Sequence, residues 1–223
     1  MVLLPKPAKD PLLSSSYRAI SILPALRKVW EHTCKMHIEK CLGRDPFHKD
    51  QYGLRRSRST IDMPRRVCGI AECCRRRGIV CVMVALHIKN AFYTLRWRTI
   101  LEETRDRRLP GQLMRILEDY LSARRIVAHC PEGKIKRYMF AGVPQGLVLG
   151  PLLWNLVYDG FLRALDSLKD VDAVAFTDDL ALIITARKMK ISGTGFAVWS
   201  RGRCYGATTQ VFSWQQRRLK LFH

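Results

Sequence analysis

The spacing of hydrophobic residues predicts two helices in the first third of the chain. Three prolines among the first eleven residues oppose a helix, so residues 1–20 are expected to be extended. From Ser21 to Gly43 the apolar residues recur at helical spacing, which predicts an amphipathic helix. Its expected apolar face consists of Leu23, Leu26, Trp30, Cys34, Ile38 and Cys41. A basic loop then leads into a second helix, which is expected to end where cationic residues precede Gly78.

A strand, further helices and a hairpin are expected in the middle of the chain. Residues 79–88 form a continuous apolar run bounded by turn signals, which is typical of a strand buried on both faces. Helical patterns run to Ile100 and again over residues 113–121, and residues 126–140 have the pattern of a hairpin. A loop rich in Gly and Pro then enters an almost wholly apolar helix that ends near Leu165.

Two short apolar runs within residues 171–185 flank the sequence Thr177-Asp178-Asp179. This pattern predicts two antiparallel strands joined by a tight turn. Adjacent carboxylates on a short loop repel each other, and a bound divalent cation such as Mg²⁺ would relieve that repulsion. The alternative is an ordinary turn without a metal ion, since Asp is common in turns.

The order of strand, helix, helix and hairpin indicates an α+β fold with a ferredoxin-like, split β-α-β arrangement. In that arrangement the strand at 79–88 lies beside the hairpin at 171–185. His87, at the end of the first strand, is then expected to face the turn that carries Asp178 and Asp179.

The charge of the chain indicates a polyanionic partner. Lys and Arg number 39 against 19 Asp and Glu, a formal net charge of +20 over 223 residues. Nucleic acid is favoured over a membrane surface because no long basic amphipathic helix is evident. No uncharged apolar run approaches the roughly 18 residues of a membrane span, and no secretory signal is recognisable. The eight cysteines are therefore expected to be reduced thiols of a protein that is not secreted.

The composition changes after Ala186. Residues 187–223 contain eight Lys or Arg and no Asp or Glu, and no regular period is evident. We expect this segment to be a disordered basic tail or sequence from a shifted reading frame.

Five blocks stand in a fixed order along the chain. They are Leu4-Pro-Lys-Pro with Tyr17-Arg-Ala-Ile-Ser21, Gln51-Tyr-Gly-Leu with Ser59-Thr60, Ala85-Leu-His-Ile-Lys-Asn-Ala-Phe92 with Trp97, Gly142-Val-Pro-Gln-Gly-Leu-Val-Leu-Gly-Pro151, and Ala175-Phe-Thr-Asp-Asp-Leu180. Together they resemble the reverse transcriptase domain of non-LTR (LINE-type) retrotransposons, over residues 1–186. The resemblance implies a right-hand polymerase fold with partial fingers at 1–78, a ferredoxin-like palm at 79–186 and no thumb.

The resemblance also implies an activity, RNA-directed DNA polymerisation. In this family a DNA primer's 3′-hydroxyl attacks a dNTP on an RNA template, and two Mg²⁺ ions hold the attacking and leaving oxygens. Asp178 matches a catalytic metal ligand, and Asp179 matches the carboxylate that supports it. The family acts in the nucleus at nicked chromosomal DNA, which is the implied location, with the cytoplasm as a second possibility.

Further site residues follow from the same motifs. The implied nucleotide-binding residues are Lys6, Arg18, Phe92 and Gln145, and the implied nucleic-acid-binding residues are Arg55, Arg56, Arg58 and Gly146. Phe92 matches the bulky residue that excludes a ribose 2′-hydroxyl, and its alternative role is core packing. Gln145 matches a residue against the template or nucleotide, and its alternative role is loop structure. For the cations, the alternative is a solvated surface charge.

His87 is the main departure from the family pattern, which has Asp at this position. Neutral imidazole is a poor ligand for Mg²⁺ and cannot bridge two metal ions as a carboxylate does. Leu147 replaces Ser, Ala19 replaces Pro, and Thr177 stands where Ala is commoner. Three hypotheses follow: a reverse transcriptase domain impaired at His87, a catalytically dead basic nucleic-acid-binding remnant, or a relic reading frame that gives no stable protein.

Overall fold

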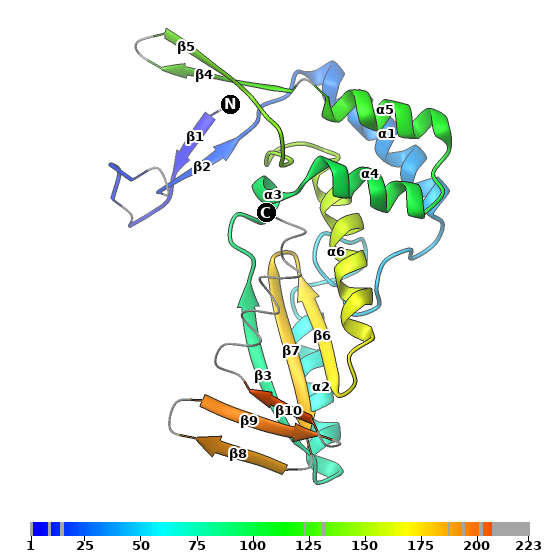
Figure 1. Cartoon of the computed structure of the whole chain (residues 1–223). Helices are drawn as coiled ribbons and strands as arrows, with labels where there is room; N and C mark the ends of the chain where they lie inside the picture. The colour runs from blue at the N-terminus through cyan, green and yellow to red at the C-terminus, as the bar shows by residue number, and fades with distance from the viewer. Residues whose placement is uncertain are drawn as a thin grey trace. The chain divides into compact units, whose positions relative to one another are not determined.

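The computed structural model describes residues 2–8, 10–13, 16–122, 124–130, 133–186, 188–192, 195–200 and 203–206. Its helices are α1 (Ala25–Leu42), α2 (Asp62–Arg76), α3 (Ala91–Thr94), α4 (Trp97–Asp106), α5 (Gly111–Leu121) and α6 (Gly150–Asp166) (Figure 1). Its strands are β1 (Val2–Pro5), β2 (Tyr17–Ile20), β3 (Val80–His87), β4 (Arg125–Cys130), β5 (Gly133–Tyr138), β6 (Val171–Phe176), β7 (Asp179–Ala186), β8 (Lys188–Ser192), β9 (Gly195–Ser200) and β10 (Arg203–Gly206).

The chain divides into two compact units. One comprises Met1–Pro46 and Phe92–Val157, and the other comprises Phe47–Ala91 and Tyr158–His223. The boundary falls inside α6, so each unit contains one half of this helix. None of the helices in the described part of the chain is long and apolar enough to cross a membrane.

The first unit contains two separate hairpins together with α1, α3, α4 and α5. β1 pairs antiparallel with β2, and β4 pairs antiparallel with β5. The N-terminal residues that the prolines keep out of a helix are therefore extended, as predicted, and they pair with each other.

The buried face of α1 differs from the predicted one. Cys34 and Ile38 are buried, as predicted, but Leu26 is 85% exposed. Glu31 is fully buried in its place. The spacing of 31, 34 and 38 is still helical, so the period was correct and the predicted face was displaced around the helix.

A three-stranded antiparallel sheet is the centre of the second unit. The strand order is β3-β7-β6, with the predicted hairpin formed by β6 and β7. β3 pairs with β7 along its whole length, from Val80 opposite Ala186 to His87 opposite Asp179. The predicted neighbourhood of strand 79–88 and the hairpin is therefore confirmed.

The prediction that this first strand is buried on both faces was wrong. None of the eight residues of β3 is fully buried, and Met83 is 57% exposed. β3 is an edge strand, so it has a neighbouring strand on one side only. Six of the eight residues of β7 are buried, because β7 is the central strand.

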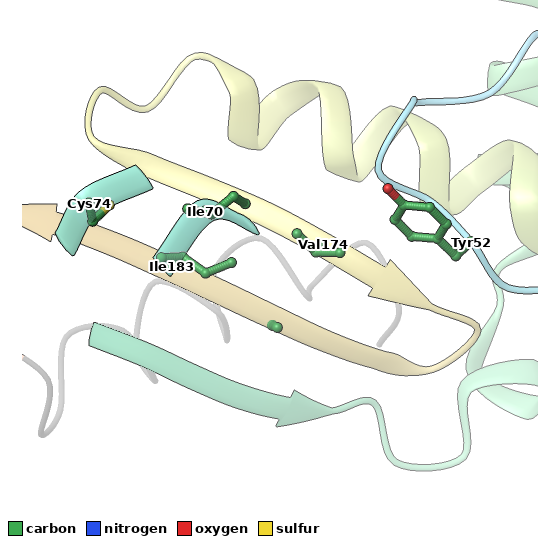
Figure 2. Packing of buried hydrophobic residues seen from close by; sticks show 6 residues of the cluster. Tyr52, Ile70, Cys74, Val174 and Ile183 are labelled. Atoms are coloured by element: carbon green, nitrogen blue, oxygen red, sulfur yellow. The ribbon is translucent and has the colours of Figure 1, made fainter. Parts of the chain in front are cut away.

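The α2 helix covers one face of this sheet. Ile70 and Cys74 pack from α2 against Val174 of β6 and Ile183 of β7, and Tyr52 joins them from the preceding loop (Figure 2). This cluster explains the apolar positions in the hairpin, because every second residue of a strand points to the same face.

Three short strands follow β7, where the sequence predicted no regular structure. β8, β9 and β10 form a separate antiparallel sheet in the order β10-β9-β8. Residues 207–223, the remainder of the predicted tail, lie outside the described residues. The assignment of 187–223 as sequence foreign to the domain stays a prediction.

Candidate functional site

Asp178 and Asp179 lie at the end of the β6-β7 hairpin, as the sequence predicted. Phe176 pairs with Asp179, so Thr177 and Asp178 form a two-residue turn. The backbone carbonyl of Asp178 accepts a hydrogen bond from the amide of Ile88, at 2.8 Å. This contact ties the turn to the chain that leaves β3, so the turn is anchored on the side where β3 ends.

His87 faces the two carboxylates. Its Nδ1 atom lies 3.0 Å from Oδ1 of Asp179 and 3.7 Å from Oδ2 of Asp178. One ligand atom from each of the three side chains lies within 4.8 Å of the other two. The predicted juxtaposition is thus confirmed, and it produces a mixed nitrogen and oxygen donor set at the end of the sheet.

A loop approaches the turn closely, at Gly53. A Cβ atom added to Gly53 would lie 2.1 Å from the backbone nitrogen of Thr177, so only glycine fits there without a shift of the backbone. Tyr52 and Ala175, next to these residues, share a backbone hydrogen bond of 2.8 Å. Thr177 itself has a φ of +56°, a left-handed conformation that is unusual for a β-branched residue.

The phenol of Tyr158, in the second half of α6, is buried near the carboxylate pair. Burial raises the pKa of Tyr158, and the negative charges of Asp178 and Asp179 raise it further. The phenol therefore stays protonated wherever the carboxylates are ionised. It therefore does not add a third negative charge to this end of the sheet.

The donor set does not fit a pair of Mg²⁺ ions. Mg²⁺ takes oxygen ligands in octahedral geometry, and a bridged pair needs a carboxylate that contacts both ions. His87 offers a nitrogen, which can bind only one ion through Nδ1. The three side chains therefore match a metal site in position but not the two-magnesium site that the sequence motifs implied.

Phe92 is found in the first unit, where it packs in the core. Its ring lies 5.3 Å from that of Trp154, and its side chain is half-buried. Its carbonyl accepts a hydrogen bond of 2.7 Å from Val143, at the start of the Pro144-Gln145-Gly146 loop. Core packing, the alternative role, therefore accounts for a bulky side chain at this position, and the nucleotide role stays a prediction.

The Pro144-Gln145-Gly146 loop is held against the end of β2. The Gln145 carbonyl accepts a hydrogen bond of 2.8 Å from Ser21, while the residue as a whole is exposed. Gly146 has a φ of +95°, and an added Cβ would lie 2.4 Å from the Ser21 carbonyl oxygen. Glycine is thus required by the chain itself, and a role for Gly146 in binding nucleic acid stays a prediction.

Lys6 and Arg18 belong to the hairpin of β1 and β2. Arg18 pairs with Leu4, and the amide of Lys6 donates to the Ser16 carbonyl at 2.7 Å. Because Lys6 is two residues beyond Leu4, the strand alternation predicts that Lys6 and Arg18 share one face. Both candidates therefore lie in the same unit as Phe92 and Gln145, whereas His87, Asp178 and Asp179 lie in the other.

The three arginines of the basic loop have different environments. Arg55 is half-buried, and its Nη1 atom donates to the carbonyls of His48 and Gln51, at 2.7 and 2.8 Å. Arg56 and Arg58 are exposed, with the Arg58 guanidinium 5.3 Å from the Tyr52 ring. Arg55 therefore stabilises the loop, while Arg56 and Arg58 have the exposure that phosphate contacts need.

Glu31 was not predicted from the sequence as a functional residue. Its buried carboxylate accepts hydrogen bonds from the Tyr120 hydroxyl (2.9 Å) and from the amides of Val148 (2.7 Å) and Leu149 (3.2 Å). These amides directly follow the Pro144-Gln145-Gly146 loop, so Glu31 fixes its C-terminal end. The available signal in the sequence was a charged residue at helical spacing from Cys34 and Ile38.

Comparison with known proteins identifies the family. Residues 4–208 match the reverse transcriptase (RNA-dependent DNA polymerase) family. This match extends past residue 186, where the predicted resemblance ended, and includes β8 to β10.

Two curated relatives come from retrotransposons of Drosophila melanogaster. The chain is 29% identical over 182 residues to the putative 115 kDa protein in type-1 retrotransposable element R1DM, covering 82% of this chain and 17% of that protein. It is also 29% identical over 208 residues to the probable RNA-directed DNA polymerase from transposon X-element, covering 88% of this chain and 23% of that protein. The chain thus spans about a fifth of the length of these relatives.

Solved structures with a similar fold include two telomerases. One is telomerase from Candida albicans in complex with a TWJ fragment of telomeric RNA, with a TM-score of 0.55 at 10% identity, covering 87% of this chain and 32% of that one. The other is apo telomerase from Candida tropicalis truncated from its C-terminal domain, with a TM-score of 0.51 at 12% identity, covering 69% of this chain and 33% of that one. This likeness supports a polymerase fold of mixed helices and sheet. The chain therefore belongs to the reverse transcriptase family, as a reverse transcriptase domain of the non-LTR, LINE-type kind.

Proposed function

We propose that this chain is an RNA-directed DNA polymerase domain in which nucleotidyl transfer is impaired by His87. Membership in the family implies a divalent metal ion, generally Mg²⁺. The substrates we propose are an RNA template, a DNA primer and dNTPs, with the nucleus as the place of action. The relatives named as RNA-directed DNA polymerases from mobile elements support this assignment.

The proposed subdomains are those of a right-hand polymerase. The sheet of β3, β7 and β6, with α2 against it, corresponds to the palm, since it carries the Asp178-Asp179 turn. The β1-β2 hairpin and α1 correspond to part of the fingers, with Lys6 and Arg18 toward the triphosphate. In this proposal Phe92 excludes a ribose 2′-hydroxyl and Gln145 lies against the template or nucleotide.

The distance of 3.0 Å between His87 and Asp179 carries the proposal of impaired catalysis. It means that position 87 is directed at the carboxylate pair, so the loss of a carboxylate there changes the charge at the reacting phosphates. Removing one group that stabilises the transition state typically lowers the rate by about 10²–10³. The loss of a carboxylate at position 87 should cost at least as much.

Primer extension on an RNA template tests the proposal. The wild-type chain, His87→Asp and the double variant His87→Asp/Asp178→Asn are compared with Mg²⁺ and dNTPs. We expect His87→Asp to extend the primer at least about tenfold faster than wild type. This increase is smaller than the full effect of one group that stabilises the transition state. The double variant should return to the wild-type rate. Extension by the wild-type chain that equals that of His87→Asp would refute impairment at this position.

A second candidate function is nucleic-acid binding without catalysis. The net charge of +20 and the exposure of Arg56 and Arg58 favour it. Counterion release makes such binding weaken steeply as the salt concentration rises. The slope of log K against log salt concentration becomes more negative by about 0.7 for each phosphate contact to a single strand. Titration of single-stranded RNA with the wild-type chain at several salt concentrations checks this. Binding that does not change with salt would exclude this candidate.

A further inference from the structure

We propose that His87, Asp178 and Asp179 bind one borderline divalent ion of the first transition row, with Zn²⁺ preferred over Mg²⁺. This inference rests on the proposed function, because it concerns the same end of the sheet. It is a separate claim, because the metal ion that the site prefers does not depend on whether the chain extends a primer.

The first argument is the position of the donor atoms. The Nδ1 atom of His87 lies 3.0 Å from Asp179 Oδ1 and 3.7 Å from Asp178 Oδ2. Ligand atoms about 2.0–2.2 Å from one Zn²⁺ ion lie roughly 3–3.6 Å from each other. The two distances from His87 are therefore close to the spacing that a single ion requires, and all three donor atoms lie within 4.8 Å of one another.

The backbone holds these donors in place. Pairing of His87 with Asp179 is the last rung of the β3-β7 ladder, and the Asp178 carbonyl is bound to the Ile88 amide. The packing of Gly53 against Thr177 restricts the turn from another direction. A site on paired strands needs little reorganisation when the ion binds.

Charge is the second argument. Two carboxylates carry two negative charges, which balance one divalent ion but leave half the charge of two ions uncompensated. A single ion therefore matches the charge of this end of the sheet, whereas a closely spaced pair of ions would repel each other.

Donor chemistry is the third argument. Imidazole suits zinc, copper and nickel, while carboxylates alone suit magnesium and calcium. Zn²⁺ binds both imidazole nitrogen and carboxylate oxygen, and a site with three protein ligands leaves a further position open to water. The side chains of His87 and Asp179 are 61% and 63% exposed, so an ion has access from solvent.

Calorimetric titration of the full chain with ZnCl₂ and with MgCl₂ tests the inference. We expect one Zn²⁺ site that depends on His87 and has a Kd at least tenfold lower than that for Mg²⁺. His87→Ala should weaken this site at least tenfold. His87→Asp should lower the ratio of zinc to magnesium affinity, because it restores an all-oxygen donor set.

Two controls separate this site from other zinc-binding groups. Zinc bound by free thiols is the same in wild type and in the His87 variants, so only the difference between titrations is counted. His37→Ala removes an exposed histidine on α1, one turn before Cys41, and should leave the His87-dependent site unchanged. Identical zinc titrations of wild type and His87→Ala, or tighter binding of Mg²⁺ than of Zn²⁺, would overturn the inference.

The primer-extension and zinc-binding experiments can refute the two proposals independently of each other. If His87→Asp restores primer extension while zinc binding does not respond to His87→Ala, the proposed function stands and the zinc site falls. If zinc binding depends on His87 while His87→Asp extends no primer, the zinc site stands and the proposed function falls.

Discussion

His87 and Asp179 are partners at the end of the β3-β7 ladder, and their side chains meet there, with Nδ1 and Oδ1 3.0 Å apart. Each strand delivers its last residue to the same point, so this contact follows from strand register. Where the family resemblance implies an aspartate, the chain therefore has an imidazole in contact with a carboxylate.

His87→Asp should make stability depend on Mg²⁺. Without metal the variant places a third carboxylate beside Asp178 and Asp179, and their repulsion should lower the free energy of unfolding. The decrease should not exceed about 1 kcal/mol, because the group is exposed. A bound ion stabilises the folded state by about 2.7 kcal/mol at one hundred times its Kd. Thermal unfolding at increasing MgCl₂ should therefore raise the Tm of His87→Asp more than that of wild type. Equal increases in Tm would contradict the prediction.

Gly53→Ala should destabilise the protein through the turn that carries the carboxylates. The added methyl group would meet the backbone of Thr177 at 2.1 Å, and overpacking of this kind costs about 1–3 kcal/mol. Gly69→Ala is the matched control, because an added Cβ at Gly69 in α2 meets nothing within 4 Å. It should stabilise α2 by up to about 1 kcal/mol. Urea unfolding of both variants measures the difference, and equal stabilities would contradict the close approach.

Glu31→Ala should destabilise the first unit by at least about 2 kcal/mol, because it leaves the amides of Val148 and Leu149 without their acceptor. Tyr120→Phe removes a single donor to the same carboxylate and should cost about 1 kcal/mol. Glu39→Ala is the control on the same helix. Glu39 forms a partly exposed ion pair with Lys35, at 3.8 Å, and its loss should cost less than about 1 kcal/mol. Urea unfolding of the three variants measures these differences.

The arginine variants should separate loop stability from binding. Arg55→Ala removes two hydrogen bonds to backbone carbonyls and should lower the free energy of unfolding by about 1–3 kcal/mol. Arg56→Ala/Arg58→Ala should cost less stability than Arg55→Ala, about 1 kcal/mol or less for the contact of Arg58 with the Tyr52 ring. It should make the slope of log K against log salt concentration for RNA binding shallower by about 1.4, because two phosphate contacts are lost. A double variant with the wild-type slope would show that these residues do not contact phosphates.

The sequence alone predicted most elements of the domain and the place of its carboxylates. Helical periodicity located α1, α2, α5 and α6, and two apolar runs around Thr177 located the β6-β7 hairpin. The order of these elements was enough to place His87 opposite the turn. These predictions succeeded because they depend on local periodicity and on how strands connect.

Only the tertiary structure decided which residues are buried and what they contact. β3 is as apolar as a central strand, yet the order β3-β7-β6 leaves it at the edge. Glu31 is charged, yet three donors from distant segments make its burial favourable. The requirement for Gly53 likewise arises from Thr177, more than one hundred residues later in the chain.

The composition and order of local patterns therefore determined the family, the fold class and the candidate metal-binding turn. The chemistry of that turn was decided by the register between two strands, which brings a nitrogen donor to two carboxylates. Distances between side chains depend on the packing of the whole sheet, and no local pattern in the sequence specifies them.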